Sequence, residues 1–141
     1  KKKLPIYGNG EQMRDWIHVD DHCRAIMFIL EDGKIGEQYL IGGDNCIQNI
    51  DMAIKICELL DEKIPLKEYS YKNLIEYVKD RPGHDYRYSI DSKKIKEQLG
   101  WKPKIDFYDG LRDTINWYID NEIIWKKIQE DNYSGERIGL R

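Results

Sequence analysis

Segments with apolar residues at helical spacing alternate along this chain with short β-prone runs. After Asp20 and Asp21, apolar residues at positions 25, 26, 29 and 30 predict a helix, and the two carboxylates suit its electropositive N-terminus. Residues 50–60 carry a similar stripe, and Asn49 stands where an N-cap is expected. The alternation predicts an α/β chain, with mixed α and β elements, short strands and a more helical C-terminal half.

Four short runs are predicted to form strands. Runs at residues 4–8 and 12–19, joined by Gly8-Asn9-Gly10, are expected to pair as a hairpin. Residues 37–41 and 75–78 predict two more strands, whereas residues 45–49 are expected to form a polar loop. On the second strand Arg14 shares a face with Trp16, so Arg14 is either an edge charge or an aimed functional group.

The C-terminal third is predicted to be mainly helical. Asp91 is expected to cap a short helix through Ile95 and Leu99, and Gly100 occupies the usual position after a helix end. A long helical pattern begins at Phe107 and continues through Ile128. We therefore expect one domain over residues 1–129, followed by a polar tail over residues 130–141.

Composition excludes several classes of protein. The chain has 141 residues and a net charge of −3, which disfavours binding to nucleic acid. Its three cysteines form no C-x-x-C pair, so we predict no metal site and no disulfide framework, as in a cytoplasmic protein. No apolar run approaches the roughly 20 residues that span a bilayer, so no association with a membrane is expected.

Residues 80–88, with the sequence DRPGHDYRY, gather donors around one Pro-Gly corner. Pro82 fixes φ and Gly83 accepts dihedrals closed to other residues, so Arg81 and His84 flank a sharp turn. Such a loop could bind an anion. The residues alone equally allow a solvated turn in which Asp80 and Asp85 neutralise the arginines.

Five motifs occur in an order that closely resembles the C-terminal part of the dTDP-glucose 4,6-dehydratase family. They are LPIYGNG at 4–10, RDWIHVDDH at 14–22, YLIGG at 39–43, DRPGHD at 80–85 and LGWKP at 99–103. Members of this family are extended short-chain dehydrogenase/reductases. The resemblance implies a cytoplasmic lyase of deoxysugar biosynthesis that uses NAD to convert dTDP-glucose into dTDP-4-keto-6-deoxyglucose, with the intact enzyme a homodimer.

The resemblance also implies roles for individual residues. Arg14 and Arg81 would hold the diphosphate of the nucleotide sugar, which agrees with the paired donors of a guanidinium. Asn49 would contribute to the diphosphate or ribose region, and His84 would lie near the nucleotide. Pro5 and Tyr7 would border the base. Tyr133 is a further candidate, although the sequence around it departs from the family pattern.

The family's cofactor and catalytic motifs are not found in this sequence. It contains no Gly-x-x-Gly-x-x-Gly cradle, no Tyr-x-x-x-Lys pair and no Asp-Glu pair in the family's context. NAD is therefore expected to bind to an N-terminal Rossmann domain that precedes this portion, and the chain alone is expected to be inactive and to expose apolar surface. The alternatives are a lobe of a UDP-sugar epimerase, decarboxylase or dehydratase, and a non-catalytic binding module.

Overall fold

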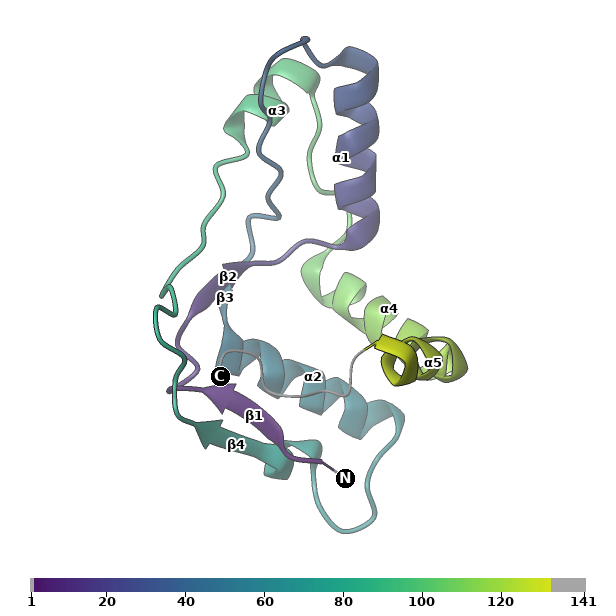
Figure 1. Cartoon of the computed structure of the whole chain (residues 1–141). Helices are drawn as coiled ribbons and strands as arrows, with labels where there is room; N and C mark the ends of the chain where they lie inside the picture. The colour runs from purple at the N-terminus through teal and green to yellow at the C-terminus, as the bar shows by residue number, and fades with distance from the viewer. Residues whose placement is uncertain (1, 133–141) are drawn as a thin grey trace.

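The computed structural model describes residues 2–132 and confirms a mixed α/β fold built on two small sheets (Figure 1). Strand β1 (Leu4–Tyr7) pairs in parallel with β4 (Ile75–Val78), and β2 (Met13–Asp15) pairs antiparallel with β3 (Cys46–Gln48). The helices are α1 (Val19–Asp32), α2 (Asn49–Lys63), α3 (Lys93–Leu99), α4 (Phe107–Asp120) and α5 (Glu122–Asn132), and a 3₁₀ turn, η1 (Tyr71–Leu74), precedes β4. No helix among these residues is long and apolar enough to cross a bilayer.

The predicted hairpin of residues 4–8 and 12–19 is wrong, because β1 and β2 do not pair with each other. The Gly10 N–H does donate to the Tyr7 carbonyl at 3.1 Å, as expected of a turn. The chain then passes over the start of α2, where the Gly10 carbonyl accepts from the Ile50 N–H at 2.9 Å. This tertiary contact sends β2 toward β3 and leaves β1 to pair with a strand about seventy residues away.

Two local predictions also fail. Residues 37–41 form no strand, although Tyr39 and Ile41 pack toward the core while Leu40 between them is exposed. Residues 46–48, expected to be loop, form β3. The cause lies in Asp15, whose carboxylate accepts from the backbone N–H groups of Gly43 and Asn45 and holds that segment beside β2.

Helix boundaries follow the sequence more closely. The His18 side chain caps α1 by accepting from the Asp20 N–H at 3.3 Å. Gln48, not Asn49, is the N-cap of α2, and Asn49 is its first helical residue. Gly100 ends α3 in the left-handed region with φ of 66°, as predicted.

The best buried part of the core joins α1 to α3. Ala25, Ile95 and Trp101 are at most 1% exposed and contact one another, with Phe28 and Ile29 packed against them. Burying a large aliphatic or aromatic side chain contributes about 2–3 kcal/mol, so this cluster stabilises the upper part of the molecule in Figure 1.

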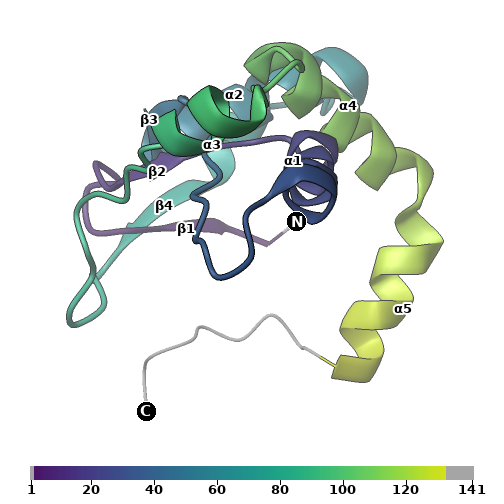
Figure 2. The same ribbon diagram turned by 90° about the horizontal axis from the view of Figure 1, so that it is seen from above.

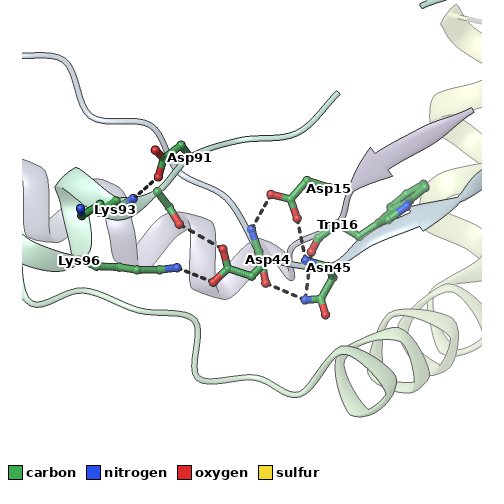
Figure 3. A network of polar contacts seen from close by, with 9 residues as sticks. Asp15, Trp16, Asp44, Asn45, Asp91, Lys93 and Lys96 are labelled. Carbon is green, nitrogen blue, oxygen red and sulfur yellow. Dashed lines mark hydrogen bonds and ion pairs between the residues drawn. The ribbon is translucent and has the colours of Figure 1, made fainter. Parts of the chain in front are cut away.

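A polar network connects α3 to the β2–β3 sheet (Figure 3). Asp44 accepts from Ser92 and pairs with Lys96, while the Asn45 side chain donates to the carbonyls of Gly43 and Trp16. The loop between residues 43 and 45 is thereby fixed from both sides.

The long C-terminal helical pattern is two helices. Asn121 separates α4 from α5, with its side-chain amide donating to the Trp117 carbonyl at 2.9 Å. Figure 2 shows α5 extending away from the strands. α5 continues to Asn132, past the expected start of the polar tail, and Tyr133 lies outside the described residues.

Candidate functional site

The 80–88 corner is organised around the carboxylate of Asp80. Its Oδ1 accepts from the Arg81 N–H at 2.8 Å and lies 2.7 Å from Nδ1 of His84, and its Oδ2 accepts from the Gln12 side chain at 3.0 Å. The hydrogen bond from His84, followed by smaller contributions that include the Arg81 N–H, lowers the pKa of Asp80. Because an ionised carboxylate only accepts, Nδ1 of His84 carries a proton here.

The end of β1 forms one wall of this corner. The Gly8 N–H donates to the Val78 carbonyl at 2.9 Å, which places both strand ends together. Gly8 has φ of 59°, and a Cβ there would lie 2.9 Å from Oδ2 of Asp80, so glycine permits the approach. The Tyr7 ring meets the His84 ring edge-on, with centroids 6.1 Å apart, and the His84 side chain is only 5% exposed.

Arg14 is held from three directions. Nη1 donates to the Met13 carbonyl at 2.7 Å, Nη2 donates to the Asp85 carbonyl at 3.1 Å, and Cζ lies 4.5 Å from the centroid of the Tyr88 ring. These contacts use two of the five N–H donors of a guanidinium, so three remain for a ligand. These contacts fix the position of the Arg14 side chain, and whether it is an edge charge or a functional group stays a prediction.

Backbone hydrogen bonds attach the corner to β2. The Met13 N–H donates to the Tyr86 carbonyl at 2.7 Å, and the Tyr88 N–H donates to the Met13 carbonyl at 3.1 Å. The loop that carries Arg81 thus emerges beside Arg14, although the two lie 67 residues apart in sequence. The hydrogen bond to Asp85 and that residue's charge raise the pKa of Tyr88, while the charges of Arg14 and Arg81 partly oppose the rise.

The carboxylates of the corner do not neutralise its arginines. Asp80 is engaged by His84, Gln12 and a backbone N–H, and the Asp85 carboxylate accepts from the Tyr88 hydroxyl. Among residues 2–132, neither Arg14 nor Arg81 lies within ion-pair distance of an acidic side chain. Neither guanidinium of the corner is therefore paired with a carboxylate among the described residues, although the charge of Arg81 contributes to the lowered pKa of Asp80.

The remaining predicted residues lie around this corner at different depths. Asn49 begins α2, and its backbone N–H donates to the Gln12 carbonyl at 2.9 Å, next to the Gln12 side chain that reaches Asp80. Pro5 is exposed on β1 opposite Glu76, and it precedes Tyr7 on this strand by two residues. The functional role of each predicted residue stays a prediction, since placement alone does not test it.

The sequence does not predict the supporting roles of three side chains. Gln12 lies in a β-prone run, Asp80 is predicted only as a countercharge, and no separate role is predicted for Tyr88. The hydrogen bond from Gln12 to Asp80 and the contact of Tyr88 with Arg14 join residues distant in sequence, so no local pattern identifies them. The one signal available in the sequence is the position of Tyr88 three residues after Asp85, which allows the hydrogen bond between these two side chains.

The described residues do not fit the pyrophosphate of a dinucleotide cofactor. Such a cradle needs free backbone N–H groups at a glycine-rich strand-to-helix turn. β3 instead runs directly into α2, and the N–H groups of Asn49 and Ile50 already donate to the carbonyls of Gln12 and Gly10.

An open, largely apolar cavity of about 820 Å³ lies elsewhere, between the start of α1 and helices α2 and α4. Its lining includes Trp16, His18, Met52, Phe107 and Trp117. None of the predicted site residues contributes to it, so the cavity is separate from the arginine site.

Comparison with known proteins identifies the family of this chain. A sequence model of the family described as GDP-mannose 4,6 dehydratase matches residues 1–114. A probable dTDP-glucose 4,6-dehydratase from Sinorhizobium fredii is 49% identical over 140 residues, which are 99% of this chain and 40% of the relative. The chain thus spans about two fifths of the length of such relatives.

Solved structures show the same fold. The dTDP-glucose 4,6-dehydratase of Bacillus anthracis, crystallised in complex with NAD, is 45% identical with a TM-score of 0.77, covering 90% of this chain and 38% of that one. The UDP-glucose 4-epimerase of Thermotoga maritima, solved with UDP-glucose, is 28% identical with a TM-score of 0.69, covering 85% and 36%. From the matched family model and the shared fold, we conclude that this chain belongs to the GDP-mannose 4,6 dehydratase family and is similar to part of the dTDP-glucose 4,6-dehydratases.

Proposed function

We propose that this chain is the substrate-binding portion of an NAD-dependent dTDP-glucose 4,6-dehydratase, a lyase, and that Arg14 and Arg81 bind the diphosphate of dTDP-glucose. The observation that carries the proposal is that the loop bearing Arg81 is hydrogen-bonded to β2 beside Arg14, while the carboxylates of Asp80 and Asp85 are hydrogen-bonded to His84 and Tyr88. Two guanidiniums offset the charge of a diphosphate and offer paired donors to its oxygens.

The other predicted residues complete the proposed site. His84 and Tyr7 form the wall beside Arg81, Asn49 lies behind Gln12, and Pro5 extends the wall along β1. We assign the base to the Pro5–Tyr7 side and the diphosphate to the arginine side. NAD and the catalytic groups would be supplied by the part of the enzyme that precedes this portion, and the whole enzyme would be a cytoplasmic homodimer, as the resemblance implies. Residues 1–129 remain the proposed domain.

The test is titration of the chain with dTDP by calorimetry. Arg14→Ala and Arg81→Ala should each weaken binding about tenfold or more, since each removes charged hydrogen bonds. Arg112→Ala is the matched control, because Arg112 is on α4 and pairs with Asp109 across one helical turn. Unchanged affinity in both site variants would contradict the diphosphate assignment.

A UDP-sugar epimerase portion is the second candidate, supported by the match to the Thermotoga maritima structure. Titration with UDP in parallel separates the two, since the dehydratase proposal expects tighter binding of dTDP. We also expect no 4-keto product when the chain is incubated with dTDP-glucose and NAD, with the Bacillus anthracis enzyme as the positive control. Product formed by the chain alone would contradict the proposal that another part of the enzyme supplies NAD and the catalytic groups.

A further inference from the structure

An acidic residue, Asp85, lies within the proposed anion site. It follows Arg81 by four residues in the sequence, and its backbone carbonyl accepts a hydrogen bond from Arg14. Nη2 of Arg14 donates to that carbonyl at 3.1 Å, so the carboxylate on the same residue is close to a guanidinium it does not pair with. A free aspartate beside two arginines would normally form an ion pair with one of them and reduce the charge available to a ligand.

Tyr88 accounts for this arrangement. Its hydroxyl donates to Oδ2 of Asp85, while its ring lies under the guanidinium of Arg14 at 4.5 Å from Cζ. One side chain therefore engages the competing carboxylate and supports the cation from below. The backbone of Tyr88 is itself fixed, since its N–H donates to the Met13 carbonyl that also receives Nη1 of Arg14.

We infer that Tyr88 is a positioning residue that keeps Asp85 from pairing with the site arginines and orients Arg14 for the diphosphate. This inference rests on the proposed function, because it assumes that the arginines bind the nucleotide diphosphate. It goes beyond that function because it assigns two separate roles to Tyr88. The hydroxyl keeps the Asp85 carboxylate from pairing with the arginines, and the ring orients the guanidinium of Arg14.

The hydroxyl is tested by Tyr88→Phe, which removes one oxygen and retains the ring. The released Asp85 carboxylate should then pair with Arg14 or Arg81, and dTDP affinity should fall about fivefold. Adding Asp85→Asn should restore the affinity, because the amide carries no charge. A purely structural role would not be rescued in this way. Tyr69→Phe, in an exposed position away from the corner, is the matched control.

The ring is tested by Tyr88→Leu combined with Asp85→Asn. With the carboxylate neutralised, this variant should still bind dTDP more weakly than Tyr88→Phe with Asp85→Asn, since the cation–π contact is lost. Equal affinities of the two double variants would overturn the orienting role. Wild-type affinity of Tyr88→Phe, or no rescue by Asp85→Asn, would overturn the charge-controlling role.

A ligand-free measurement separates this inference from the proposed function. Hydrogen exchange of the arginine guanidinium protons, followed by NMR, should slow at Arg14 or Arg81 in Tyr88→Phe and recover with Asp85→Asn. Unchanged exchange would contradict the inference alone. The expected exchange pattern together with no dTDP binding by the unmodified chain would contradict the diphosphate proposal and support the charge-controlling role of Tyr88.

Discussion

At the scale of one residue, the main interactions of Asp21 differ from the helix-start role that the sequence predicts. The sequence places it at a helix start, where a carboxylate is favourable. In the structure it is 1% exposed, accepts from the backbone N–H groups of Lys104 and Ile105, and pairs with Arg24 at 2.8 Å. Asp21 thus connects α1 to the segment that follows Trp101.

Replacing Asp21 by Asn should reduce the free energy of unfolding by about 3 kcal/mol, because the change leaves Arg24 without its partner and turns an amide toward backbone donors. Urea denaturation measures the effect. Asp20→Asn is the matched control, since the neighbouring Asp20 side chain is 77% exposed. Equal stability of the two variants would show that the buried carboxylate is dispensable.

The corner should respond to acid through Asp80. Its pKa lies below the ordinary 3.8, chiefly because of the hydrogen bond from His84. The stabilisation that accompanies a depressed carboxyl pKa is present above the ordinary value and is lost as pH falls through the folded value. The NMR shift of the Arg81 amide should therefore titrate with a midpoint below 3.8, and a midpoint at or above that value would contradict the assignment.

At the scale of a secondary-structure element, the end of α3 at Gly100 is correctly predicted from the sequence. Gly100 ends α3 with φ of 66°, and a Cβ there would meet no atom within 4 Å. Any penalty for a side chain must therefore come from backbone conformation and not from a clash.

We expect Gly100→Ala to lower the free energy of unfolding by about 1 kcal/mol, whereas Gly100→Asn should cost less because Asn tolerates the left-handed region. Thermal denaturation of the two variants side by side checks the order. If alanine proves no worse than asparagine, the conformational explanation of this helix end fails.

At the scale of the whole molecule, α1 is apolar on two sides. Ala25 and Ile29 face the core, while Val19, Ile26, Met27 and Leu30 are between 42% and 74% exposed on the other side. The expected exposed apolar surface is thus present. Ile26 and Leu30, which belong to the predicted apolar stripe, are among these exposed residues.

Exposed apolar surface of this kind promotes association. The double variant Ile26→Gln, Leu30→Lys should reduce concentration-dependent association in sedimentation velocity and leave the helical circular dichroism unchanged, because exposed substitutions cost little stability. Glu31→Gln, a polar exposed change on the same helix, is the control. Association that persists in the double variant would locate the responsible surface elsewhere.

Capping, periodicity and motif order are local properties, so the sequence predicts most of the helices, the end of α3 at Gly100 and the family motifs that contain Arg14 and Arg81. The tertiary structure alone establishes that β1 pairs with β4, that residues 46–48 become a strand, and that Gln12 and Arg14 reach Asp80 and Asp85. These contacts join groups distant in sequence, and the cost of bringing them together is met by contacts that no short segment contains.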